Sequence, residues 1–188
     1  SSWVAKSRNQ LLSIFMSNSK ATHILFIDSD IGFVPDDITK LISRNKYIIS
    51  GCYPKRTYPV QYPFLLADQN NADPEADILE CVGLPGGFLL IKREAIEILK
   101  DAYPELKLKN KGPDNKVNEE YYGFFSTFVD KNTQEHHSED YSFCVRWRRL
   151  GGKLWIHSEV DLSHSGNLKY SSKFKEVLKL AQGKEINK

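Results

Sequence analysis

Short apolar runs alternate with amphipathic segments along most of this chain, and this alternation is the feature that most limits its fold. The run from Thr22 to Ile27 is apolar and partly β-branched, which favours a buried strand. Other segments repeat apolar residues at helical spacing, as Phe143 and Trp147 do four residues apart. The series predicts an α/β fold, with a mixed, mainly parallel sheet flanked by helices.

The boundaries of these elements follow from the apolar spacing and from proline and glycine breaks. We predict helices at 3–18, from Pro35 onward, and at 93–102, 139–150 and 171–181. Strands are predicted at 22–27, 47–50, 78–82, 88–91 and 153–156. The polar stretch 107–120 is predicted to be a loop, and the aromatic stretch 121–129 a strand.

Composition limits the class of protein. The 188 residues suit one domain, which we place at 1–188, with 40% hydrophobic and 27% charged residues. A net charge of +2 gives no reason to expect a nucleic-acid partner, and no apolar run is long enough to cross a bilayer. The three cysteines form neither a disulfide framework nor a zinc motif, so we expect a reducing, cytoplasmic setting and buried thiols.

The strand at 22–27 ends directly in Asp28-Ser29-Asp30. Two carboxylates beside a buried strand are costly unless a cation compensates them, and such hard oxygen ligands suit Mg²⁺ or Mn²⁺. The pattern itself is common by chance. These aspartates could equally satisfy the donors of a turn before the helix at Pro35.

Two loops could contribute to binding. Gly83-Leu84-Pro85-Gly86-Gly87 separates two predicted strands, so its backbone could approach a ligand closely, although a tight turn explains it equally well. Lys55 and Arg56 lie in a proline-rich loop and could reach a diphosphate, or could simply be solvated charges.

Two later segments carry candidate catalytic side chains. Ser138-Glu139-Asp140 opens a predicted helix, so Asp140 could be a general base, or the acids could simply favour the helix dipole beside an N-cap serine. His164 lies in a polar turn after a strand, where it could bind a metal ion or remain solvated.

The order of these motifs resembles that of GT-A glycosyltransferases, the nucleotide-diphospho-sugar transferases. The likeness runs from about Arg8 to about Gly166, and the phrases Thr22-His-Ile-Leu-Phe-Ile-Asp-Ser-Asp-Ile and Ser138-Glu-Asp-Tyr-Ser-Phe-Cys look most like small viral and bacterial members. The resemblance implies transfer of a sugar from a nucleotide-sugar donor to a carbohydrate or other hydroxyl acceptor, with Mn²⁺ or Mg²⁺ as the cofactor.

The resemblance also implies roles for single residues. Asp30 and His164 would coordinate the ion, Asp28 would contact the metal shell or the donor ribose, and Ser29 would lie against the donor. Gly86 and Gly87 would line the pocket for the donor sugar and the acceptor. In an inverting reaction Asp140 would take the acceptor proton, with Glu139 close by.

One departure from the family pattern stands out, because GT-A domains begin with a strand and a helix that this chain lacks before its first helix. We therefore expect an N-terminally incomplete domain. Two alternatives stay open. A haloacid-dehalogenase-like phosphohydrolase also places Asp-x-Asp after a strand. That family, however, has a Gly-Thr or similar small pair directly after the second aspartate, where this chain has Ile31-Gly32, and it has no role for His164. A non-catalytic sugar- or nucleotide-binding module of GT-A shape is the other.

Overall fold

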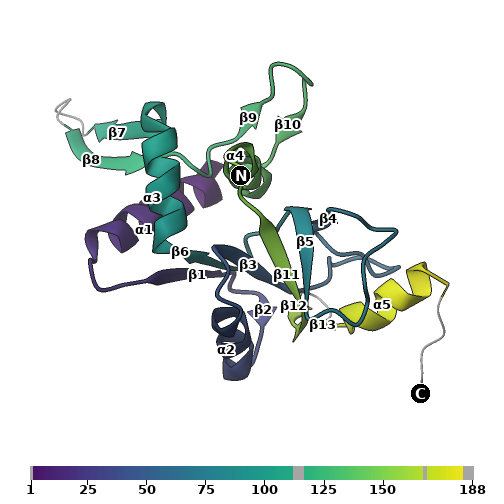
Figure 1. Ribbon diagram of the computed structural model, residues 1–188. Helices are drawn as coiled ribbons and strands as arrows, with labels where there is room; N and C mark the ends of the chain where they lie inside the picture. The colour runs from purple at the N-terminus through teal and green to yellow at the C-terminus, as the bar shows by residue number, and fades with distance from the viewer. Residues whose placement is uncertain (1, 112–116, 167–168, 184–188) are drawn as a thin grey trace. The chain divides into compact units, whose positions relative to one another are not determined.

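The computed structural model describes residues 2–111, 117–166 and 169–183. It divides into two compact units (Figure 1). The first unit consists of Ser1–Ile24 and Ile91–Gly152, and the second of Leu25–Leu90 and Lys153–Lys188. The prediction of a single, N-terminally incomplete domain stays a prediction, and each unit is described by itself below.

A six-stranded sheet provides most of the second unit. Its strand order is β1-β6-β3-β11-β5-β4, and it consists of β1 (His23–Ile27), β3 (Ile48–Cys52), β4 (Leu65–Leu66), β5 (Ile78–Gly83), β6 (Phe88–Lys92) and β11 (Leu154–Asp161). β1 and β6 begin or end just beyond the boundary between the units.

The strand directions correct one prediction. β3 runs parallel to β11, whereas β5 runs antiparallel to both β11 and β4. The amide of Asp28 bonds to the carbonyl of Gly87 and that of Arg93 to the carbonyl of Thr22, so β1 and β6 are antiparallel as well. The α/β prediction is confirmed, but the sheet is mainly antiparallel, and the prediction of a mainly parallel sheet is wrong.

Shorter elements complete the second unit. They are α2 (Pro35–Ser43), α5 (Phe174–Ala181), and a three-stranded sheet of β13 (Lys169–Tyr170), β12 (Ser163–Ser165) and β2 (Ile31–Gly32). One hydrophobic cluster joins this small sheet to the large one and to α2. Its buried members are Ile31, Leu41, Ile49, Tyr53, Phe88, Leu90, Val160 and Leu162. The small sheet is therefore held firmly on the large one, which matters because it carries His164.

The first unit is largely helical. Its elements are α1 (Ser2–Ser17), α3 (Arg93–Ala102), the short 3₁₀ helix η1 (Pro104–Leu106), β7 (Lys107–Lys111), β8 (Val117–Tyr122), β9 (Phe128–Val129), β10 (His136–His137) and α4 (Glu139–Arg149). Phe125 and Phe143 are fully buried and stack with ring centroids 4.6 Å apart. Phe124 and Phe125 are thus core residues.

Two segments of the first unit differ from prediction. The predicted loop at 107–120 contains the hairpin of β7 and β8, in which Lys109 pairs opposite Glu120 and Lys107 Nζ lies 2.5 Å from the Glu120 carboxylate. Cross-strand charge pairs can stabilise a hairpin whose residues show no apolar alternation. The predicted strand at 121–129 is instead the end of β8, a turn, and β9.

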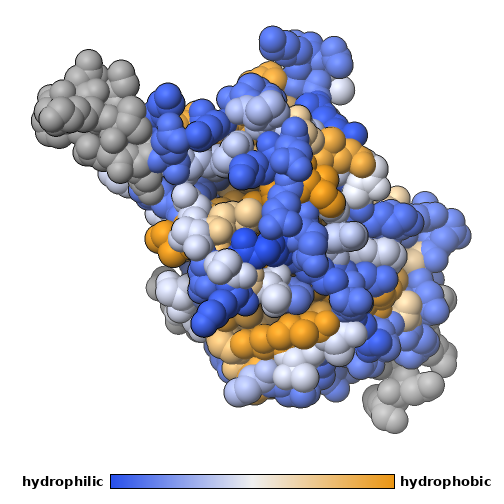
Figure 2. Space-filling model, turned by 60° about the vertical axis from the view of Figure 1, so that its left-hand side comes forward, coloured by the Kyte–Doolittle hydropathy of each residue, from blue (hydrophilic) through white to orange (hydrophobic). Residues whose placement is uncertain are grey.

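All three cysteines are free and buried, as predicted. None of the helices in the described part of the chain combines the length and apolar character needed to cross a membrane. On the face shown in Figure 2, hydrophobic side chains appear in separate patches between hydrophilic ones.

Candidate functional site

A tight turn after β1 presents the aspartates in the second unit. The amide of Ile31 donates to the carbonyl of Asp28 at 3.0 Å, and this bond closes the turn between β1 and β2. Ile31, which directly follows Asp30, is a buried member of the hydrophobic cluster described above. The end of the turn is therefore anchored in the core. Asp28 and Ser29 are exposed and Asp30 is half-buried, so their side chains are available to a ligand.

Strand pairing brings His164 to this turn. β12 lies antiparallel to β2, with His164 opposite Ile31, and the amide of Ser165 donates to the carbonyl of Asp30 at 2.7 Å. As a result, His164 Nε2 lies 3.5 Å from Asp30 Oδ2. The two residues are 134 positions apart in the sequence, yet they lie side by side, as the resemblance to GT-A enzymes implies.

A backbone contact orients the imidazole of His164. Its Nδ1 lies 2.9 Å from the carbonyl oxygen of Pro54. A carbonyl only accepts, so the proton of the neutral ring resides on Nδ1 and the Nε2 lone pair faces Asp30. This is the arrangement that metal-binding histidines usually have, with the second ring nitrogen donating to a carbonyl.

Tyr53 links His164 to the glycine loop. Its ring packs edge-on against the imidazole, with centroids 5.5 Å apart, and its hydroxyl accepts the amide proton of Gly87 at 3.1 Å. A side chain at position 87 would have no room, because a Cβ there would lie 2.5 Å from the Tyr53 hydroxyl and 3.1 Å from Asp28 Oδ2. The absence of a side chain at Gly87 therefore lets Asp28 and Tyr53 approach each other, with the buried Gly86 just before.

Tyr53 was missed by the sequence analysis. It directly follows β3 and is 6% exposed, so it reads as one more core aromatic residue. The one signal was indirect, because two consecutive glycines before a strand suggest that some bulky group lies close by. Nothing in the sequence tells which group that is.

Arg56 and Lys55 lie in the loop between β3 and β4, and they behave differently. The guanidinium of Arg56 donates to Asp30 Oδ2, the same oxygen that faces His164. Lys55 is exposed, and its backbone amide bonds to the carbonyl of Gln61. Of the two predicted diphosphate contacts, only Arg56 is thus seen to join the Asp30 cluster in the described structure.

The donor set around Asp30 can be compared with what a divalent ion requires. Two ligands at right angles, each about 2.1 Å from Mg²⁺, are about 3 Å apart, so the spacing of 3.5 Å between Asp30 Oδ2 and His164 Nε2 fits a shared ion. Among the described residues, no group of three or more His, Cys, Asp or Glu side chains is arranged to hold a metal. Mg²⁺ sites commonly use one or two protein ligands, with water and substrate phosphates supplying the others.

The remaining predicted residues, Glu139 and Asp140, belong to the first unit and open α4. Arg8 of α1, 5% exposed, donates to Asp140 Oδ1, and its guanidinium lies 3.9 Å from Glu139. Ser138 occupies the N-cap position but makes no capping bond with its side chain. Asp140, the candidate base, is thus held in an ion pair with a buried guanidinium. The joint action of the two units stays a prediction.

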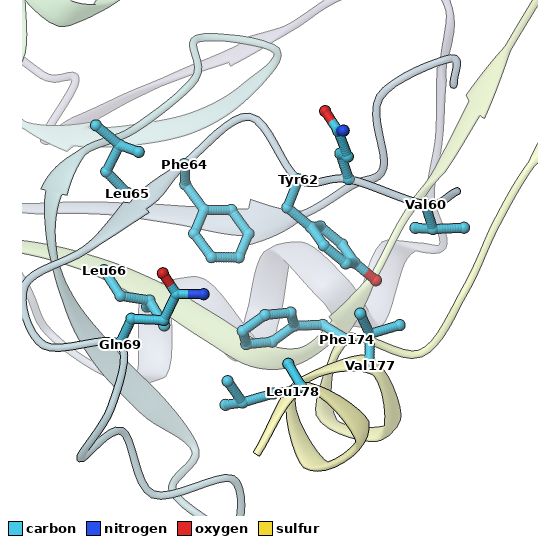
Figure 3. Close-up of a pocket in the computed structure, with 11 residues that line it drawn as sticks. Val60, Tyr62, Phe64, Leu65, Leu66, Gln69, Phe174, Val177 and Leu178 are labelled. Atoms are coloured by element: carbon cyan, nitrogen blue, oxygen red, sulfur yellow. The ribbon is translucent and has the colours of Figure 1, made fainter. Parts of the chain in front are cut away.

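The second unit also contains an apolar cavity of about 380 Å³ (Figure 3). Tyr62, Phe64 and Phe174 pack edge to face around it, and Val177 and Leu178 of α5 close one side. The Tyr62 side chain is fixed by a hydrogen bond between its hydroxyl and that of Ser172, whose oxygens lie 2.7 Å apart. Burial raises the pKa of Tyr62 well above its usual value. None of the predicted site residues lines this cavity.

Comparison with known proteins shows that the fold of this chain is similar to that of a solved structure. Neither the protein-family models nor the curated proteins provide a match to this chain. Among solved structures, the crystal structure of A197 from STIV is similar, with a TM-score of 0.55 and 19% sequence identity. The match covers 91% of this chain and 72% of that one. An identity this low carries the fold alone, so the function has to be argued from the site.

Proposed function

We propose that this chain is a metal-dependent glycosyltransferase of GT-A type, which transfers a sugar from a nucleotide-sugar donor to an acceptor hydroxyl. One observation carries the proposal, namely the meeting of Asp30 Oδ2 with His164 Nε2, whose ring is oriented by the Pro54 carbonyl. A phosphohydrolase gives His164 no such use. The metal ion of the proposed enzyme would be Mn²⁺ or Mg²⁺.

Asp30 and His164 would hold the ion, and Asp28, beside Gly87, would face the donor. The bound ion would supply Lewis-acid stabilisation of the charge that develops on the departing diphosphate. Gly86 and Gly87 would line the pocket for the donor sugar and the acceptor, with Gly87 letting Asp28 and Tyr53 lie close beside it. Asp140, which pairs with Arg8, would take the acceptor proton in an inverting reaction, a contribution of typically ~10²–10⁴-fold in rate.

The first test is calorimetry of UDP, GDP and inorganic pyrophosphate, each with and without Mn²⁺. We expect Mn²⁺ to strengthen the binding of at least one of these ligands to the wild-type chain, and D30N and H164Q to remove that effect. D36N is the matched control, because Asp36 is an exposed carboxylate on α2 whose ion pair is with Lys40. Equal affinities with and without Mn²⁺ would contradict metal dependence.

The second test separates transfer from its alternatives. D140N should abolish sugar transfer while donor binding persists, and NMR of the product anomer should show inversion. Turnover of p-nitrophenyl phosphate without any acceptor would instead favour a phosphohydrolase. Unchanged transfer in D140N, or retention of the anomeric configuration, would remove the proposed role of Asp140 as the base.

A further inference from the structure

Asp30 shares one carboxylate oxygen between two neighbours. Oδ2 accepts a hydrogen bond from Arg56 Nη2 and also faces His164 Nε2 at 3.5 Å. Asp30 therefore cannot offer this oxygen fully to an ion while Arg56 remains on it. The guanidinium is always charged, and it would repel a divalent ion that shares its partner.

Arg56 is well placed to leave Asp30. Its side chain is 43% exposed and that of Asp30 is 36% exposed, and an ion pair this accessible to water holds its partners only weakly. Arg56 also lies in an irregular loop, four residues beyond the end of β3. A short reorientation of the long side chain is enough to separate the two groups.

A diphosphate is a better partner for Arg56 than Asp30 is. It carries more negative charge, and its oxygens can accept two parallel hydrogen bonds from the planar guanidinium. If the diphosphate binds at Asp30 and His164 as proposed above, it arrives within reach of Arg56. Arg56 can then move from Asp30 to the phosphate without losing a charged partner.

We infer that Arg56 exchanges partners, pairing with Asp30 in the free protein and with the diphosphate in the loaded one. The exchange opposes the binding of a divalent ion alone and favours the binding of ion and diphosphate together. By linkage, each ligand then raises the affinity for the other. This inference rests on the proposed function, since it requires the ion and the diphosphate to share the Asp30 site.

The experiment is calorimetry on the full chain with two probes, Mn²⁺ alone and preformed Mn²⁺–pyrophosphate, for the wild type, R56M and R56K. The matched control is K153M, which removes an exposed cation of the same unit whose ion pair is with Glu80. R56M should bind Mn²⁺ alone about two- to fivefold more tightly, because a weak exposed pair is removed. R56M should bind Mn²⁺–pyrophosphate about tenfold more weakly, because a charge-assisted contact is lost. R56K should fall between, and K153M should match the wild type.

The opposite signs of the two effects identify the exchange. The inference is overturned if R56M binds Mn²⁺ alone no more tightly than the wild type, which includes the case in which neither protein binds it. It is also overturned if the affinities for both probes change in the same direction. D30N separates this failure from that of the proposed function. If D30N loses Mn²⁺–pyrophosphate binding, the proposed metal site stands even though Arg56 has no part in it. If D30N binds Mn²⁺–pyrophosphate as the wild type does, the proposed metal site is itself contradicted. Thermal unfolding of each variant checks that it is folded.

Discussion

At the scale of single residues, the site in the second unit depends on close packing around Gly87. Tyr53 contacts both His164 and the Gly87 amide, so it couples the glycine loop to the imidazole. The resemblance to GT-A enzymes was enough to pair Asp30 with His164, because that family's motifs imply a shared metal ion. Tyr53 and the Pro54 carbonyl could not be found in this way, since their roles arise from contacts with residues far away in the chain.

This packing predicts a non-additive pair of substitutions. Y53F should destabilise the protein by about 1–2 kcal/mol, because the buried Gly87 amide loses its partner. G87A should cost about 1–3 kcal/mol, because the new methyl group meets the Tyr53 hydroxyl. The double variant should lose less than the sum, since Y53F removes the atom nearest to that methyl group. Urea unfolding of the four proteins measures the coupling, and strict additivity would contradict the contact.

At the scale of elements, the sequence was most informative where apolar residues repeat. The predicted helix at 93–102 is α3, and α2 begins at Pro35 as predicted. The β7–β8 hairpin was missed because its pairing depends on charges across strands, not on alternation along one strand. The direction of the strands was also misjudged, since apolar runs such as Ile78–Val82 show burial but not which way a strand runs beside its neighbour.

β11 carries a buried histidine that should make stability depend on pH. His157 is 1% exposed, and burial followed by the nearby Arg44 charge lowers its pKa. The ordinary pKa of histidine is 6.5. Below that pH the unfolded chain takes up a proton at His157, whereas in the folded protein the lowered pKa shifts this protonation to a lower pH. The unfolding free energy should therefore fall as the pH drops from about 7.5 to about 5.5.

H157Q is the informative variant, because glutamine can still accept a hydrogen bond from Arg44, whose Nε lies 3.2 Å from His157 Nε2. We expect a shallower decline of the unfolding free energy with falling pH in H157Q than in the wild type. Chemical denaturation at several pH values gives both curves. An identical decline in the two proteins would assign the effect to other groups.

At the scale of the whole molecule, the two units carry different parts of the proposed reaction. Asp28, Asp30, Arg56 and His164 belong to the second unit, whereas Glu139 and Asp140 belong to the first. The α/β class followed from the alternation of apolar runs with segments of helical periodicity. The division into two units did not, because it depends on the density of contacts between segments distant in the chain.

The buried thiols report on each unit separately. Cys52 and Cys81 lie in the second unit and Cys144 in the first, and each is at most 1% exposed. Burial also raises the pKa of Cys52, so its thiol should react only after local opening. Because the proposed ligands bind the second unit, Mn²⁺ with pyrophosphate should slow the alkylation of Cys52 and Cys81 by iodoacetamide more than that of Cys144. Mass spectrometry in mild urea measures each site, and equal slowing of all three would contradict this assignment.

The pairing of β2 with β12 also has a consequence for biosynthesis. The turn that carries Asp30 is translated before the segment Ile91–Gly152, but the strand that carries His164 is translated only after it. A nascent chain that stops before β12 thus has the carboxylates without the imidazole. Any affinity for an ion that depends on both side chains arises only once β12 has been translated and has paired with β2.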